Sequence, residues 1–218
     1  MARAGLSREV VVAQAAAIAD EIGWDRLTLA AIAASLGVKL PSLYKHITSL
    51  DGLRRDLAVA ATRQLAETLA VAAVGRAGTD ALSAAANAYR SFAVAHPGRY
   101  AATVRAPAPE DAEHREAADA VMRVVFAVLS GYGLAGDDAV DAARALRASL
   151  HGFVALECGG GFAMPRAPER SYHRLIEAFD QTLRRWPSSS DEASLDMGSQ
   201  NARRCRRDPA RPTDREPG

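Results

Sequence analysis

The sequence predicts an all-α fold, and three observations lead to this expectation. Apolar residues recur every three or four positions almost throughout the 218 residues, and no segment shows the strict alternation of a β-strand. Aromatic residues make up only 6% of the chain while alanine is abundant, which favours closely packed helices over a sandwich of sheets. Hydrophobic residues account for 49%, so a substantial core can form.

The first three predicted helices are short and are bounded by clear local signals. An apolar stripe over residues 11–22 indicates the first helix, which Gly23 can end. Thr28 is a good N-cap for the second helix, and Gly37 follows that helix at a turn. A third helix is expected over residues 39–46. Two short helices separated by one turn are typical of a helix-turn-helix.

Six further helices are expected in the rest of the folded chain, each marked by an apolar stripe and bounded by Gly, Pro or a capping residue. They are predicted over residues 49–74, from Thr79 or Asp80 to His96, from Pro97 to Val104, through Met122 to Leu129, from Asp137 or Asp138 to Cys158, and through Leu175 to Trp186.

The composition changes at Pro187, beyond which Ser, Pro, Asp and Arg dominate. Such a segment cannot bury enough apolar surface to fold alone. We therefore expect a helix-turn-helix domain over residues 1–48, a helical body over 49–187 and a disordered tail over 188–218. The arginine cluster at 203–207 could touch DNA, but acidic and basic residues balance in the tail, which favours a solvated segment.

Several classes of protein are not expected. Two cysteines, Cys158 and Cys205, do not form a disulfide framework, and the N-terminus resembles neither a signal peptide nor a membrane span. We expect a cytoplasmic protein with no membrane partner, no metal and no cofactor. The glycines at 159–161 lack the lysine of a phosphate loop, and His151 with Cys158 lacks a third orienting group, so no enzyme is predicted.

Residues 28–46 have the charge pattern of a DNA-reading surface. No Asp or Glu occurs between Arg26 and Leu50, although the whole chain is nearly neutral at +1. Lys39, Lys45 and His46 would attract phosphate there, whereas a carboxylate would repel it. The alternative is that this segment is only a compact structural bundle, and that the chain is a helical small-molecule binder or an enzyme.

One segment resembles the signature of the TetR/AcrR family. It covers residues 23–47, which read G-W-D-R-L-T-L-A-A-I-A-A-S-L-G-V-K-L-P-S-L-Y-K-H-I. Two further segments are similar to the regulatory domain of its WHG-type subgroup: H-P-G-R-Y at 96–100 and L-H-G-F-V-A-L-E at 150–157. In the second segment, Leu150 stands where tryptophan is expected. The resemblance implies nine helices, of which three bind DNA and the others form a ligand-binding, dimerising body. It also implies a ligand-responsive regulator, most often a repressor, although the sequence does not separate repression from activation.

The resemblance also assigns roles to residues of the helix-turn-helix. Thr28 and Tyr44 would contact phosphate, as would Lys45 or His46. The major groove would be met by Lys39, Leu40, Pro41 and Ser42. Many members carry a lysine at the start of the fourth helix, where this chain has Thr48-Ser49. We expect Ser49 or the helix N-terminus to replace that phosphate contact.

Two-fold symmetry would let two copies read a pseudo-palindromic operator. By the resemblance, the last two helices form the homodimer interface, with candidates Leu146, Leu150, Gly152, Phe153, Phe179 and Leu183. Candidates for the wall of an effector site are Tyr89, Phe92, Tyr100, Arg105, Met122, Phe126 and His151. Packing within one chain is the alternative role for both sets. The sequence does not name the effector.

Overall fold

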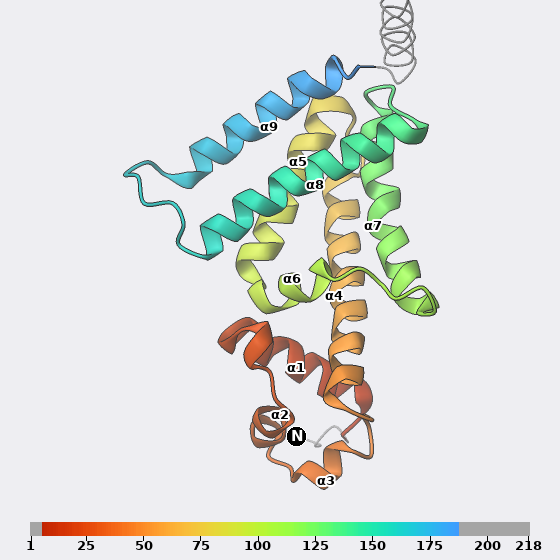
Figure 1. The fold of residues 1–218 in the computed structure, drawn as a ribbon, viewed down its shortest axis with the longest axis vertical. Helices are drawn as coiled ribbons and strands as arrows, with labels where there is room; N and C mark the ends of the chain where they lie inside the picture. Colours follow the sequence, from red (N-terminus) through yellow and green to blue (C-terminus); the bar gives the residue numbers. More distant parts are fainter. Residues whose placement is uncertain (1–5, 188–218) are drawn as a thin grey trace, which may run out of the picture.

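A computed structural model of the protein describes residues 6–187 (Figure 1). Over that range the fold contains nine α-helices, one short 3-10 helix and no strand, which confirms the predicted all-α class. Figure 1 shows α1–α3 gathered at one end, α8 and α9 beside one another towards the other end, and α4 running between the two. The predicted tail, with Cys205 and the 203–207 cluster, lies outside the described residues.

The N-terminal bundle follows its local sequence signals. Thr28 caps α2, since its Oγ1 accepts a hydrogen bond from the Ala31 N–H at 3.2 Å. Gly37 ends α2 in the left-handed region, with φ of 66°. Leu43 is fully buried in the bundle core. The elements are α1 (Arg8–Ile22), the 3-10 helix (Trp24–Arg26), α2 (Leu29–Leu36) and α3 (Leu40–Leu43).

The helix α3 is shorter than the segment 39–46 that the sequence predicts. The chain tightens after Leu43, because the His46 N–H donates to the Leu43 carbonyl, only three residues back, at 2.8 Å. Leu43 and Ile47 are both held in the core, so the turn between them is pulled inward. As a result His46 is half-buried instead of pointing fully outward.

The long helix α4 belongs to both halves of the fold. It packs against α1 and also against the three helices that follow it. The N-terminal core accordingly includes Leu53 and Leu57 of α4, together with Ala102 of α6. The domain boundary expected after residue 48 is therefore a proposed division by function, because α4 packs in both parts of the fold. The bounds are α4 (Leu50–Ala73), α5 (Gly78–Ala95), α6 (Pro97–Val104) and α7 (Ala112–Ser130).

Both α5 and α8 begin at a glycine, Gly78 and Gly136, earlier than expected. The preceding residues, Ala77 and Ala135, have no side-chain acceptor, so no side chain caps either helix. The acidic residues that we expected as caps fall inside the first turn, where their charge still favours the helix dipole. The predicted N-caps are wrong: Thr79 or Asp80, and Asp137 or Asp138. The last two helices are α8 (Gly136–Cys158) and α9 (Pro168–Arg184).

The short helix α6 lies directly against α1 because Gly98 has no side chain. A Cβ atom at Gly98 would lie 2.1 Å from the backbone carbon and oxygen of Ala19. Asp20 at the end of α1 reinforces the contact: its Oδ1 accepts from the Arg99 N–H at 2.8 Å and its Oδ2 lies 3.2 Å from Arg99 Nε. The N-terminal bundle is therefore fixed to the body through α6.

Candidate nucleic-acid interface

Eight side chains are predicted to contact DNA, and together we call them the reading face. They are Thr28, at the start of α2, and residues 39–46 except Leu43, in and around α3. Six of them are exposed, while Ser42 and His46 are half-buried. Leu40 is 41% exposed and Tyr44 56%. Large side chains exposed together beside cations indicate a surface that contacts a partner.

The start of α2 is held in place by a residue that the sequence analysis missed. The guanidinium of Arg54 on α4 donates to the carbonyl oxygens of Asp25 and Leu27, both at 3.5 Å. It also lies 5.7 Å from the ring centre of Trp24. Since Leu27 precedes Thr28, these contacts connect the position of the α2 cap to α4. Nothing local in the sequence pairs Arg54 with this turn.

The reading face carries positive charge. Within residues 6–187, neither Lys39 nor Lys45 forms a salt bridge. One acidic group does approach from α1: the pKa of Glu9 lies below its usual value, chiefly through a hydrogen bond with Ser7, and the charge of His46 adds to the shift. His46 is half-buried, which makes it a weaker candidate for phosphate than the two exposed lysines.

Ser49 stands at the N-cap of α4, where its hydroxyl accepts from the Gly52 N–H at 3.0 Å. Both Thr48 and Ser49 are exposed. Their hydroxyl protons remain free to donate, so this helix start offers the kind of contact expected in place of the missing lysine. Asp51 in the first turn also places a negative charge nearby.

A cavity of about 440 Å³ lies in the body, with walls from α4, α5, α6, α7 and α8. This volume falls within the range of small-molecule sites. Three of the predicted effector residues line it, namely Tyr89, Met122 and His151. The cavity walls are otherwise mostly Val, Leu and Ala.

The other four predicted effector residues do not line the cavity. Phe92 and Tyr100 are buried in the neighbouring core. Arg105 follows the end of α6 and is exposed. Phe126 is 36% exposed, because α7 turns Val124 and Val125 toward the cavity instead. The apolar stripe placed Phe126 on a helix that lines the cavity, α7, but it did not show which side of that helix faces the cavity.

A chain of three polar groups runs beside the cavity. The hydroxyl of Tyr100 lies 2.7 Å from the Tyr89 hydroxyl and 2.6 Å from His151 Nδ1. Burial raises the pKa of Tyr100 above its usual value, so its proton is retained. The motifs at 96–100 and 150–157 therefore meet in space. Because Arg99 beside it touches α1, α6 connects the cavity wall to the bundle.

A second connection between α1 and the body consists of ion pairs. Arg8 of α1 pairs with Asp56 of α4 at 2.6 Å, and Arg55 joins Asp56 to Asp111 and Glu113 at the start of α7. Arg55 holds the pKa of Asp111 below its usual range. A second hollow, of about 560 Å³, lies along this network. Its charged walls already pair with each other, so the apolar cavity is the better candidate for a ligand.

Three of the six residues predicted for a dimer interface pack within the chain. Leu146, Leu150 and Leu183 are buried in the core that joins α5, α7, α8 and α9. Phe153 and Phe179 are half-buried against the same core. Gly152 faces open space, since nothing lies within 4 Å of a Cβ built there.

Other kinds of site receive no support from the described residues. Across 6–187, no three metal-binding side chains cluster. In the same range, no helix combines the length and the apolar character that crossing a membrane requires.

Comparisons with known proteins agree with this arrangement. Residues 82–179 match the family described as "Tetracyclin repressor-like, C-terminal domain". An uncharacterized HTH-type transcriptional regulator of Mycobacterium tuberculosis is 45% identical over 158 residues, which is 72% of each chain. Another, from Bacillus subtilis, is 36% identical over 71% of this chain and 80% of its own length.

A solved structure has the same fold: a TetR variant from Acinetobacter baumannii AYE in complex with minocycline. It superposes with a TM-score of 0.64 over 84% of this chain and 99% of its own, at 21% identity. At this identity the likeness concerns the fold, while the family model and the two curated relatives together establish the family. The chain belongs to the TetR family of helix-turn-helix transcriptional regulators.

Proposed function

We propose that this regulator is a repressor that binds a pseudo-palindromic operator as a homodimer and is released by a small molecule. The observation that carries the proposal is the reading face, where Lys39 and Lys45 are exposed without a salt-bridge partner in the described chain. Exposed cations that flank a short helix fit the phosphates of a duplex. We place this activity in the cytoplasm, and its curated relatives favour a regulatory role over a catalytic one.

The contacts divide by residue type. Thr28 uses an oxygen lone pair to cap α2, which leaves its hydroxyl proton to donate to phosphate. Tyr44 and Lys45 contact the backbone in the same way. Lys39 and Ser42, with Leu40 and Pro41 beside them, meet the base edges of the major groove. On this assignment, the first set determines affinity and the second determines preference between sequences.

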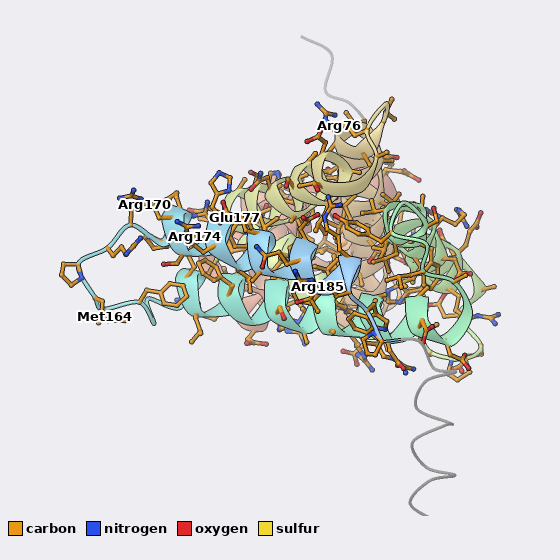
Figure 2. The ribbon with its side chains drawn as sticks, turned by 90° about the horizontal axis from the view of Figure 1, so that it is seen from above. Arg76, Met164, Arg170, Arg174, Glu177 and Arg185 are labelled. Carbon is orange, nitrogen blue, oxygen red and sulfur yellow. The ribbon has the colours of Figure 1, made fainter. Side chains whose placement is uncertain are left out.

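Dimerisation would use the outer sides of α8 and α9. On α8, Ala145, Ser149 and Gly152 form a stripe of small residues that ends at Leu156, which is 53% exposed. On α9, Ser171, Ala178 and Thr182 are exposed along a similar line. Small side chains permit close helix approach. Figure 2 shows charged side chains, among them Arg170, Arg174 and Glu177, along α9, so any apolar contact would come chiefly from α8.

Release would follow the route through α6. Val104 at one end of α6 lines the cavity, and Gly98 at the other end touches α1. A ligand that shifts α6 would change the angle between the reading face and the body. To change operator occupancy from almost complete to almost none, the ligand must bind the conformation that releases DNA more tightly than the DNA-binding conformation, by about 5.5 kcal/mol. The minocycline bound to the Acinetobacter relative is a precedent for a ligand in this fold.

The test is DNA binding by the purified protein. Fluorescence anisotropy or a gel shift with the intergenic DNA next to its own gene should show retardation, with two chains per site. Lys39→Ala or Ser42→Ala should change the ratio of affinities for the matched site and a scrambled site. Absence of binding at low salt would contradict the proposal, and equal losses on both sites would contradict the base-reading role. A reporter gene under the operator separates repression from activation.

A further inference from the structure

The cavity walls are mostly aliphatic, and this chemistry restricts which ligands the cavity can bind. Its apolar lining is aliphatic, including Leu65, Leu69, Val121 and Met122, and Tyr89 is the one six-membered aromatic ring among the lining residues. Flat aromatic ligands and quaternary cations are favoured by aromatic walls, which stack on them. Aliphatic walls suit an extended hydrocarbon instead.

The charged groups at the cavity are all cationic. Arg144 and Arg147 line it from α8, and no Asp or Glu is among the lining residues. Arg144 is already paired with Asp141, at 3.3 Å. Arg147 forms no salt bridge with any residue from 6 to 187, and its guanidinium makes only a long contact, 3.5 Å, with the Val104 carbonyl. It lies close enough to Tyr89 and Tyr100 to lower their pKa values slightly against the dominant effect of burial.

One buried group in the wall also lacks a partner. Thr62 of α4 is only 5% exposed and lines the cavity, yet its hydroxyl makes no hydrogen bond within the described chain. A buried hydroxyl without a partner costs free energy, so such groups are ordinarily satisfied. An aliphatic ligand that also carries an oxygen atom within reach of Thr62 would satisfy this hydroxyl, whereas an unsubstituted hydrocarbon chain would not.

We propose that the cavity binds an aliphatic monocarboxylate, with its hydrocarbon chain between α4, α5 and α7 and its carboxylate paired with Arg147. This inference rests on the proposed function in that it assigns a chemical class to the effector of the same regulator. Two features argue for it together: the aliphatic walls select the chain, and the unpaired guanidinium selects the anion. A neutral or cationic molecule of the same length would leave Arg147 without a partner or repel it.

Isothermal titration calorimetry on the full chain without DNA tests the assignment. The probes are decanoate, decan-1-ol and decylammonium, which share one chain and differ in charge. Decanoate should bind at least tenfold more tightly than decanol, and decylammonium most weakly. Arg147→Gln should bring the affinity for decanoate down to that for decanol and leave decanol unchanged. The matched control is Arg123→Gln, since Arg123 is exposed on α7 and does not line the cavity.

Each outcome bears on the proposal. Equal affinity for decanoate and decanol, or an Arg147→Gln variant that still prefers decanoate, would overturn the role of Arg147. Failure of all three probes to bind would overturn the aliphatic assignment. Because Arg147 is exposed, its variant should stay folded, and circular dichroism checks this. The DNA-binding experiment uses no ligand, so a protein that binds its operator but no carboxylate would retain the proposed function and lose only this inference.

Discussion

The reading face and the cavity are both formed by helices, but they differ in how far apart their residues lie in the sequence. The reading face comes from residues 28–46 and is shaped by one cap and one glycine. The cavity draws on residues between 62 and 151, contributed by five helices. The difference teaches that the first depends on local geometry, whereas the second depends on how distant helices pack. The helix α6 lines the cavity and packs against α1 of the N-terminal bundle, so substitutions there should affect the two regions together.

The largest expected effect is from Gly98→Ala, which severs the contact between α6 and α1. Alanine should stabilise a helix by about 0.8–1.0 kcal/mol relative to glycine. Here the new Cβ would overlap the Ala19 backbone, so we expect a net loss of about 3 kcal/mol or more in the free energy of unfolding. Urea unfolding measures it. In the same helix, Ala101→Gly serves as a control and should cost only about 1 kcal/mol. A Gly98→Ala protein as stable as the wild type would show that α6 and α1 are not in close contact.

The next effect concerns the reading face alone. Tyr44→Ala should weaken binding to matched and scrambled DNA by about 30- to 150-fold each, since the dimer loses two phosphate contacts of about 1–1.5 kcal/mol each, which carry no base information. Its stability should change little, because Tyr44 is 56% exposed. Anisotropy titrations measure both affinities, and Val71→Ala, at an even more exposed position on α4 (76%), is the control. A loss confined to the matched site would assign Tyr44 to base reading instead.

The reading face and the cavity also differ in how much of each the sequence could predict. The cap at Thr28 and the turn at Gly37 are local, so residue type and spacing placed them correctly, but not the contact of Arg54 with the turn before α2. The contact between Tyr100 and His151 joins positions 51 residues apart, and no periodicity reveals it. An apolar stripe predicts that Leu146 and Leu150 are buried but not whether they are buried within one chain or between two. The caps of α5 and α8 were misplaced because a helix can begin at glycine without any side-chain acceptor.

A smaller effect distinguishes the polar chain beside the cavity from ordinary core packing. Tyr100→Phe removes a hydroxyl from between Tyr89 and His151 and should cost about 1–2 kcal/mol of stability. Tyr172→Phe is the matched control, since the buried Tyr172 hydroxyl donates to the Ala86 carbonyl at 2.5 Å, away from α6. Both should lose similar stability in urea unfolding. Only Tyr100→Phe should also change affinity for DNA; an identical DNA affinity in both variants would deny α6 a role in coupling.

The smallest effect is a pH dependence at the start of α7. Burial lowers the pKa of His114 in the folded protein, with Arg55 and Arg105 adding to the shift and Asp111 opposing it. A histidine that is harder to protonate when folded contributes full stability above its unfolded pKa and loses it as the pH falls below that value. Urea unfolding at pH 7.5 and pH 5.5 should therefore show a drop for the wild type and a smaller drop for His114→Phe. Equal drops would place the titration elsewhere.

The salt dependence of DNA binding tests the reading face most directly. In Lys39→Gln/Lys45→Gln, each dimer loses four charges, so the slope of log K against log salt should become shallower by about 2–4 and the affinity should fall at least tenfold. The same charge change in Arg115→Gln/Arg123→Gln, on the exposed side of α7, should leave slope and affinity close to those of the wild type. If the two double variants behave alike, or if the wild type ignores duplex DNA at low salt, the reading face does not bind DNA.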